Sequence, residues 1–323
     1  VLEPAVTYLR IYFAGMVFNL LYNIGSSILR AIGDSRRPLY ILIVCTLTNL
    51  VLDLAFVLLF HMGVAGAGLA TILSQAISAL LVLYFLSRSN ECYKLTVRKI
   101  RFHSDILRHI IKIGLPAGIQ SSMFCISNII IQSTINTFGT DTMAAWTAYG
   151  KIDSVFWMLM SAFGISITTF SGQNFGCGKL DRVKDGVRKA TVLNLIAGLA
   201  AAVVVWLFAA PITTWFVDPG ETAVIAASVQ FLNIEAVFIL ALGVLFVYRN
   251  ALQGLGNAVM PLISGGVELA MRLAAAILLS RFLGYVGVCL ANPVAWTGAA
   301  VMLVPAYLAE LRRQQNNALA RAR

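Results

Sequence analysis

The sequence predicts an all-α membrane protein built from two related bundles of helices. Of its 323 residues, 59% are hydrophobic and 12% are charged, and this charged share is about half of that found in soluble domains. Such a chain cannot cover its apolar surface with polar side chains, so lipid is its expected solvent. A long motif also occurs twice, around residue 33 and around residue 256. Duplicated helical bundles are the usual plan of secondary transporters.

Apolar runs long enough to cross a bilayer recur along the whole chain. One crossing takes about 20 apolar residues. By that measure we expect about nine spans, at residues 5–29, 38–60, 65–87, 110–137, 144–171, 190–214, 223–252, 259–281 and 285–310.

Basic residues lie on alternate connections between these spans. Most of the 24 Lys and Arg residues fall in 30–37, 88–112, 179–189 and the C-terminal tail. Lys and Arg collect on the cytoplasmic side of membrane proteins, so we expect these connections and the C-terminus in the cytoplasm, at a bacterial-type plasma membrane. The net charge of +10 is then charge at the membrane surface. The lipid bilayer is the expected partner, nucleic acid is not, and the chain is expected to be a monomer.

The repeat aligns SILRAIGDSRRP at 27–38 with NALQGLGNAVMP at 250–261. Gly33 meets Gly256 in this alignment, and Pro38 meets Pro261. After a slip of two residues, GVAGAGLA at 63–70 also matches GYVGVCLA at 284–291. The first three spans therefore match the last three, and the middle three have no upstream counterpart. We expect about three helices to be absent from the N-terminus, so that the chain is a fragment.

A single long polar connection divides the predicted bundles. We expect residues 1–88 to form the remainder of an N-terminal lobe with three spans. Residues 89–109 would be a cytoplasmic linker that contains an interfacial helix, with Ser104 and Asp105 as its N-terminal cap. Residues 110–323 would form a C-terminal lobe of six spans with a basic tail.

No motif in the sequence predicts an enzyme. GQNFGCGK at 172–179 differs from a phosphate-binding loop, because its first glycine is one position too far from the Gly–Lys pair and Leu180 stands where Ser or Thr should bind Mg²⁺. We interpret it as a cytoplasmic turn that ends a helix. The five cysteines form no C-x-x-C pair, and no nucleophile or zinc motif is present. We therefore expect no metal site, no catalytic residue and no cofactor beyond a coupling ion.

Polar and ionisable residues within the spans are the candidates for a transport pathway, because such residues are costly in a membrane and by default functional. They are Asn49 and Asp53 in the second span, Gln120 and Asn128 in the fourth, Lys151 and Asp153 in the fifth, Glu235 in the seventh, and Glu268 and Arg272 in the eighth.

Each candidate also has a purely structural interpretation. Glu268 and Arg272 lie one helical turn apart and are expected to pair with each other, which favours a structural role for them. For Asn49 and Asp53 the structural and the functional interpretation are equally supported. Lys151, Asp153 and Glu235 have no partner one turn away, which favours function. Arg10 and Arg249 lie near span ends, where we expect them to extend toward the membrane surface.

Taken together, these motifs resemble the multidrug and toxic compound extrusion (MATE) family. The resemblance rests on LRAIGDSRRP, LQGLGNAVMP, GVAGAGLAT, AAWTAYGKID and GQNFGCGK, and it covers essentially the whole chain. It implies a MATE-like two-lobe bundle of twelve helices, of which this chain would hold helices four to twelve. It also implies an antiporter that exports amphipathic organic cations or drugs in exchange for H⁺ or Na⁺. Motif residues with an expected structural role are Gly33, Pro38, Gly256, Pro261, Gln173 and Asn174.

Two departures from the family pattern bear on ion coupling. The first helix, where many members carry a coupling aspartate, is expected to be absent. The run 110–137 contains no acid, although some branches place a coupling glutamate there. Glu235 is then the first candidate for coupling, followed by Asp153 and Asp53.

Two other functions remain open. One is a lipid-linked saccharide flippase of the same superfamily, which would prefer a cationic cavity with Arg10, Lys151 and Arg272 as candidates. The other is a non-functional membrane fragment.

Overall fold

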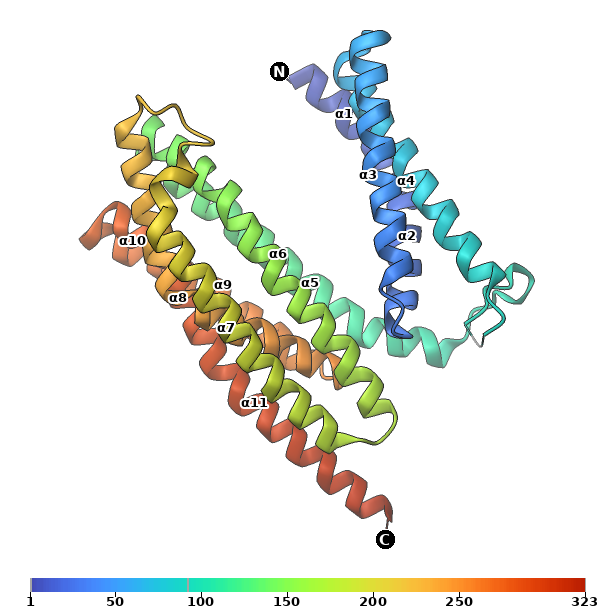
Figure 1. The fold of residues 1–323 in the computed structure, drawn as a ribbon. Coiled ribbons are helices and arrows are strands. Elements are labelled where there is room, and N and C mark those ends of the chain that lie inside the picture. The colour runs from blue at the N-terminus through green and yellow to red at the C-terminus, as the bar shows by residue number, and fades with distance from the viewer. Residues whose placement is uncertain (1, 92, 323) are drawn as a thin grey trace. The chain divides into compact units, whose positions relative to one another are not determined.

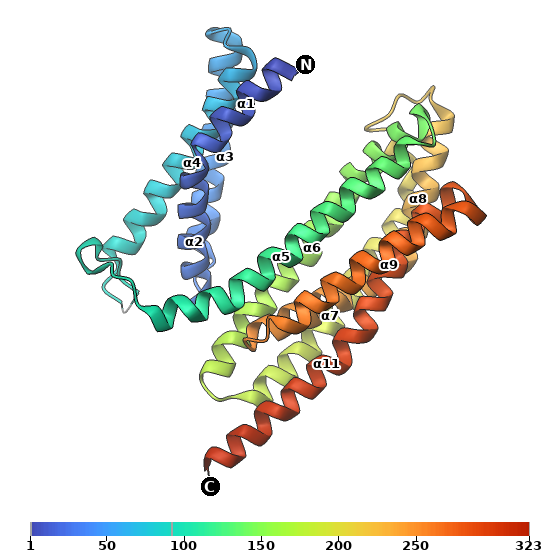
Figure 2. The same ribbon diagram turned by 180° about the vertical axis from the view of Figure 1, so that it is seen from behind.

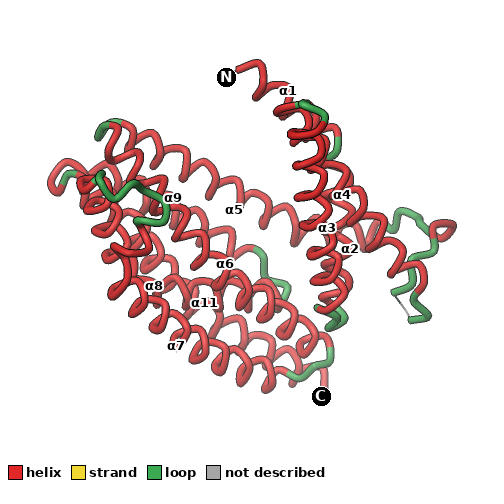
Figure 3. The backbone as a smooth tube through the Cα atoms, turned by 45° about the horizontal axis from the view of Figure 1, so that its top comes forward, coloured by secondary structure: helices red, strands yellow, loops and turns green. Residues whose placement is uncertain are grey.

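The computed structural model describes residues 2–91 and 93–322, apart from the side chains of residues 318, 321 and 322. Every regular element among these residues is a helix (Figure 3). The α-helices are α1 (Leu2–Ala14), α2 (Met16–Ala31), α3 (Arg36–Leu54), α4 (Gly63–Arg88), α5 (Ser104–Asn136), α6 (Thr140–Gly176), α7 (Leu180–Thr213), α8 (Thr222–Gly254), α9 (Val259–Leu283), α10 (Tyr285–Cys289) and α11 (Ala291–Ala322). A π-helical segment, Ala55–Leu59, extends α3, and a short 3₁₀ helix, Val97–Lys99, precedes α5.

The number of membrane-spanning helices agrees with the sequence prediction. Within the described residues, eight helical segments are long and apolar enough to cross a bilayer. The bent pair α1 and α2, with an angle of 47° between them, would make a ninth span. The bend lies at Gly15, where a Cβ atom would approach the Ile72 side chain to 2.5 Å. A side chain at this position would therefore push α4 away from the bend.

The chain divides into two compact units, Val1–Phe102 and His103–Arg323. In the first unit α4 packs against α1, α2 and α3. Its core consists of Leu29, Ile41, Val82 and Leu86.

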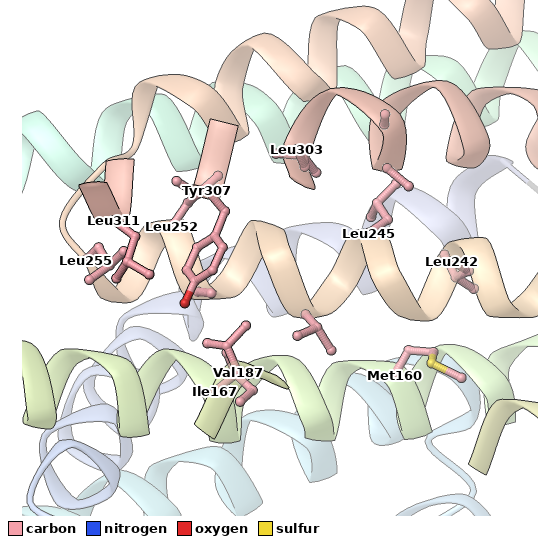
Figure 4. Close-up of a cluster of buried hydrophobic side chains, with 14 of the residues drawn as sticks. Met160, Ile167, Val187, Leu242, Leu245, Leu252, Leu255, Leu303, Tyr307 and Leu311 are labelled. Carbon is pink, nitrogen blue, oxygen red and sulfur yellow. The ribbon is translucent and has the colours of Figure 1, made fainter. Parts of the chain in front are cut away.

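In the second unit α8 is the central helix. It packs against α6, α7 and α11, while α9 packs against α5 and α11 (Figures 1 and 2). Leu252 of α8 and Leu255, the residue directly after α8, meet Tyr307 and Leu311 of α11 in the core of this unit (Figure 4). A helix that is apolar on all sides is expected to be buried, and α8 has buried residues along most of its length.

The two copies of the sequence repeat fold into the same turn. Gly33 and Gly256 have φ angles of 90° and 80°, in the left-handed region that favours glycine. In each copy the amide of the next residue, Asp34 or Asn257, donates to the carbonyl five positions earlier at 3.0 Å. This hydrogen bond is typical of the Schellman motif that ends helices.

The residue after the glycine also begins the next helix in both copies. Asp34 Oδ1 accepts hydrogen bonds from the amides two and three positions later, at 3.1 and 3.2 Å. Asn257 Oδ1 does the same at 3.2 Å for both amides. Pro38 and Pro261 are each the third residue of the following helix and are buried, where the missing amide hydrogen costs no helical bond.

The two turns differ in their other partners. Asp34 pairs with Arg37 of its own turn at 3.2 Å. Asn257 is uncharged and forms no salt bridge. Its Nδ2 instead donates a hydrogen bond to Glu310 of α11 at 3.0 Å. Gln314 also donates to Glu310, at 2.6 Å.

The second part of the repeat is also reproduced. Gly63 and Gly284 both have a φ angle of 55°. A Cβ atom at Gly66 would approach Phe56 Cβ, in the π-helical segment that extends α3, to 3.0 Å, and one at Gly287 would lie 2.2 Å from the carbonyl carbon and oxygen of Leu279. In both copies a glycine therefore permits close approach to the end of the preceding helix.

The GQNFGCGK segment ends α6 as a turn, as the sequence predicts. Gly178 has a φ angle of 70°, and the Lys179 amide donates to the Asn174 carbonyl at 2.8 Å. The Gln173 carbonyl accepts from the Cys177 amide at 3.2 Å. Gln173 and Asn174 thus provide the carbonyl groups on which the turn closes.

The helix after the linker starts differently from the prediction. α5 runs without interruption from Ser104 through Pro116 to Asn136, so the helix expected in the linker and the span after it are one continuous helix. His103 occupies the cap position with an extended backbone, and no side chain caps the helix. The predicted cap by Ser104 and Asp105 is wrong, because both residues already lie inside the first turn. There the negative charge of Asp105 still interacts favourably with the helix dipole.

Candidate functional site

The polar side chains of the second unit gather around a cavity of about 410 Å³. It lies among α5, α6, α8 and α9, of which α5 and α9 run side by side (Figures 1 and 2). Its polar and aromatic lining consists of Gln120, Ser121, Phe124, Ser127, Trp157, Phe246, Arg249, Asn250, Gln253, Glu268 and Arg272. A cavity of this size can hold a drug-sized ligand.

Arg249 of α8 lies in this cavity as part of a buried ion pair. It forms a salt bridge with Glu268 of α9, and its side chain is only 13% exposed. It also donates to Ser264 Oγ at 3.3 Å. Gln120 of α5 accepts hydrogen bonds from the same guanidinium at 3.0 and 3.2 Å when its amide oxygen faces Arg249. The prediction that Arg249 extends to the membrane surface is therefore wrong, because a carboxylate on the neighbouring helix holds it inside.

Arg272 of α9 lies on the other side of Glu268. The predicted pair within α9 exists, but the closest N–O distance is 3.9 Å, and the carboxylate is shared with Arg249. Arg272 donates to Ser127 Oγ at 3.3 Å and to Asn128 Oδ1 at 3.0 Å. Its Nε has no hydrogen-bond partner among the described residues. The prediction of a self-contained Glu268–Arg272 pair is corrected accordingly.

Aromatic rings form one wall of the cavity. The Phe124 and Trp157 ring centroids are 4.9 Å apart, and those of Trp157 and Phe246 are 5.2 Å apart. The guanidinium of Arg272 lies over the Phe124 ring, 5.0 Å from its centroid. The wall thus offers flat apolar surfaces beside a cation, a combination that suits aromatic ligands with a polar group.

Two carboxylates lie at a second, much smaller pocket in the same unit. Asp153 of α6 and Glu235 of α8 line a space of about 10 Å³, together with apolar side chains that include Trp296. The two carboxylates interact electrostatically with each other. Asn292 of α11 donates to Glu235 Oε1 at 3.4 Å. A space of this volume holds about one water-sized particle, so it suits a proton, a water molecule or a small cation.

Tyr149 completes the carboxylate site. Its hydroxyl lies beside both Asp153 and Glu235. Within the described chain it makes no hydrogen bond of normal geometry. It lies one helical turn before Asp153 on α6, so a small shift of either side chain would let the hydroxyl donate to a carboxylate.

The remaining sequence candidates lie elsewhere. Lys151 is exposed on α6, and Arg10 is exposed on α1. Asn49 and Asp53 lie one turn apart on α3 of the first unit, as predicted. Asn49 Nδ2 and Asp53 Oδ1 are shielded from solvent and have no hydrogen-bond partner in the part of the chain that the structure describes.

Several site residues were not predicted from the sequence, among them Trp157, Tyr149, Ser127 and Asn292. For Arg249 a signal was available. Two antiparallel helices joined by a short turn bring together residues at equal distances from that turn, and the turn at Gly256 places Arg249 opposite the start of α9. The positions of the other four residues at the site depend on how separate helices pack against each other, and no local sequence pattern predicts that packing.

No group of three or more His, Cys, Asp or Glu side chains among the described residues is arranged to hold a metal ion.

The decisive comparison is with family models. The model of the MatE family matches residues 1–55 and 116–278. The chain belongs to the MatE family. The match covers the repeat turn at Gly33, both carboxylates and the whole lining of the large cavity. It confirms the resemblance that the motifs suggested.

Curated bacterial relatives of this MatE chain are longer proteins. The probable multidrug resistance protein YpnP of Bacillus subtilis is 31% identical over 285 residues, which cover 88% of the chain and 63% of YpnP. The probable multidrug resistance protein NorM of Thermotoga maritima is 26% identical over 92% of the chain and 63% of NorM. The chain thus spans less than two thirds of the length of these relatives.

Solved MatE-type structures share the fold. An outward-facing multidrug resistance MATE transporter matches with a TM-score of 0.90 at 23% identity, over 97% of the chain and 70% of that protein. A MOP superfamily transporter from Pyrococcus furiosus, described as having a binding pocket of reverse polarity, matches with a TM-score of 0.90 at 22% identity, over 96% and 70%. The predicted fold of a multi-pass, all-helical MATE-type membrane protein is confirmed.

Proposed function

We propose that the chain forms part of a secondary active antiporter, which exports amphipathic organic cations across the plasma membrane in exchange for H⁺ or Na⁺. The observation that carries this proposal is the pair of Asp153, which is partly buried, and Glu235, which is buried, beside a water-sized pocket in the same unit as a cavity large enough for a drug-sized solute. Membership of a family whose relatives are named as multidrug resistance proteins supports it.

The carboxylate pair is suited to ion coupling. Two carboxylates that are held close together away from water repel each other, and a bound proton or cation removes this repulsion. The pocket beside Asp153 and Glu235 is too small for an organic cation. We therefore assign the coupling ion to this pair and the exported solute to the larger cavity.

The two sites are coupled through charge. Asp153 and Glu235 both interact electrostatically with Arg272, which lines the large cavity. Neutralising the pair with a proton or Na⁺ would change the field that a solute meets in the cavity. An antiporter results if the ion and the solute favour opposite-facing states of the protein.

The flippase alternative is favoured by one observation, the presence of cationic side chains in the cavity. Of the three cations that the sequence suggested, Arg272 lines the cavity, whereas Lys151 is exposed on α6 and Arg10 is exposed on α1 of the first unit. Arg249 adds a second cation, but Glu268 pairs with it. A flippase would move a labelled lipid-linked saccharide between the leaflets of a vesicle and would not lower the cellular content of a soluble dye.

The test is the accumulation of a fluorescent organic cation in cells that express the protein, with and without a protonophore and with and without external Na⁺. We expect lowered accumulation that depends on one of the two gradients, which also identifies the coupling ion. Unchanged accumulation, with the protein confirmed in the membrane, would contradict the proposal.

We further propose that the protein is a monomer with its C-terminus in the cytoplasm. The orientation is supported by the basic connections, including the turn at Lys179 and the tail with Arg313. The molar mass of the protein–detergent complex, measured by light scattering, tests the monomer.

A further inference from the structure

The large cavity is lined by more positive than negative charge. Among the described residues that line it, Arg249 and Arg272 are cationic and Glu268 alone is anionic. Charged side chains that are buried in a protein are normally paired. The cavity therefore lacks one negative charge for full pairing of its own side chains.

The less completely paired charge belongs to Arg272. Arg249 holds the Glu268 carboxylate in its closer contact and is further bonded by Ser264 and Gln120. Arg272 has only the longer contact to Glu268, at 3.9 Å. Its other partners, Ser127 and Asn128, are neutral.

Arg272 is also almost completely buried. It is 1% exposed, and its Nε has no hydrogen-bond partner within the described residues. Asp153 and Glu235 lie within electrostatic range, but they line the separate small pocket, and none of the ion pairs between described residues joins either of them to Arg272. An acceptor with negative charge is therefore the group that would complete the environment of Arg272.

We propose that Arg272, with Arg249 beside it, binds a carboxylate of the transported solute. Carboxylates accept paired hydrogen bonds from a guanidinium. The rings of Phe124, Trp157 and Phe246 would bind the aromatic body of the same molecule. The ligand class is thus an amphipathic aromatic molecule that bears a carboxylate, including organic cations that also carry one. For transport, this inference rests on the proposed function.

A matched pair of dyes tests the subsite directly. Rhodamine B has an aromatic cation and a free carboxylate, and its ethyl ester keeps the cation and lacks the carboxylate charge. Binding of each dye to the purified full chain in lipid nanodiscs is measured by fluorescence polarisation. We expect rhodamine B to bind about tenfold more tightly than the ester, as loss of one charged hydrogen-bonded contact predicts. Equal dissociation constants for the two dyes in the unaltered protein would overturn the inference.

Variants of the protein test whether Arg272 is responsible for the preference for rhodamine B over its ester. Arg272→Gln should raise the dissociation constant of rhodamine B about tenfold and leave that of the ester within about twofold, so that the preference disappears. The control Arg188→Gln changes an exposed arginine of α7 and should keep the preference. A preference that persists in a folded Arg272→Gln variant would also overturn the inference. If this variant does not fold, the dye comparison in the unaltered protein decides.

A lipid phosphate is the other source of a negative group for Arg272. Binding is therefore repeated in nanodiscs with and without phosphatidylglycerol, and with benzoate as a competitor. Competition by benzoate at equal strength in both lipids supports the carboxylate. Loss of rhodamine B binding only when phosphatidylglycerol is present, without competition by benzoate, would assign the site to lipid and overturn the inference.

Transport of the same dyes separates this inference from the proposed function. Export of both dyes with equal binding affinity would contradict the carboxylate subsite and leave the antiporter standing. Preferential binding of rhodamine B without export of either dye would support the carboxylate subsite and contradict the antiporter.

Discussion

Arg249 of α8 and Glu268 of α9 form an ion pair inside the second unit, although 19 positions separate them in the sequence. The pair joins two helices at the wall of the large cavity. The pair also affects Arg272, because the Glu268 carboxylate that lies near Arg272 makes its closer contact with Arg249.

Removing the acid should destabilise the protein. Glu268→Gln leaves two buried arginines without a carboxylate, and breaking a buried pair in this way costs about 3 kcal/mol. Unfolding in detergent, followed by circular dichroism against denaturant, measures the change. The double variant Arg249→Met, Glu268→Leu should lose less stability than Glu268→Gln. An exposed pair, Asp185 with Lys189 of α7, serves as the control, and its disruption should change little. A Glu268→Gln variant as stable as the unaltered protein would show that the charges are compensated elsewhere.

The carboxylate pair should control coupling. Asp153→Asn and Glu235→Gln each remove one of the two charges that we propose to hold the coupling ion, so each should abolish the dependence of dye export on the ion gradient. The control Asp141→Asn changes an exposed acid in the first turn of the same helix α6 and should preserve it. Export is followed in vesicles with an imposed pH or Na⁺ gradient. Gradient-driven export in the double amide variant would assign coupling to other residues.

Gly287 should not accept a side chain. Its Cβ atom would lie 2.2 Å from the Leu279 carbonyl and 2.5 Å from the Ser280 amide nitrogen. These are backbone atoms, which cannot rotate away, so Gly287→Ala should lower the free energy of unfolding by about 3 kcal/mol. Gly266→Ala on α9 is the matched control, because no atom lies within 4 Å of its added Cβ. Equal melting temperatures of the two variants would mean that the contact at Gly287 is absent.

The proposed orientation can be checked by thiol labelling. In a variant without native cysteines, single cysteines placed at Lys179 and Arg313 should react with a membrane-impermeant reagent only after the cells are opened. Cysteines at Thr140 and Asp218 should react in intact cells, because these positions lie on the opposite connections. The reverse pattern would show that the basic connections face outward.

The spans and the turns could be predicted because their signals are local. A run of apolar residues marks a span wherever it occurs. The glycines at 33 and 256 had to adopt the same backbone in each copy of the repeat, and they do so. The cap at Ser104 was predicted wrongly because the backbone bends one residue earlier, at His103.

The candidate site could be predicted only in part. Asp153 and Glu235 were identified singly, from the cost of an acid within a membrane span. That they lie at one pocket depends on the packing of α6 against α8. The sharing of Glu268 between two arginines depends on the reach of side chains between helices, which hydropathy does not encode.

The two repeat turns have the same backbone conformation, but their side chains interact with different parts of the chain. The turn at Gly33 is closed by a salt bridge within itself, between Asp34 and Arg37. The turn at Gly256 is fastened through Asn257 to Glu310, far along the last helix. A displacement of the start of α9 would therefore carry the C-terminal half of α11 along with it. The first turn is thus stabilised from within itself, whereas the second also links the connection between α8 and α9 to α11.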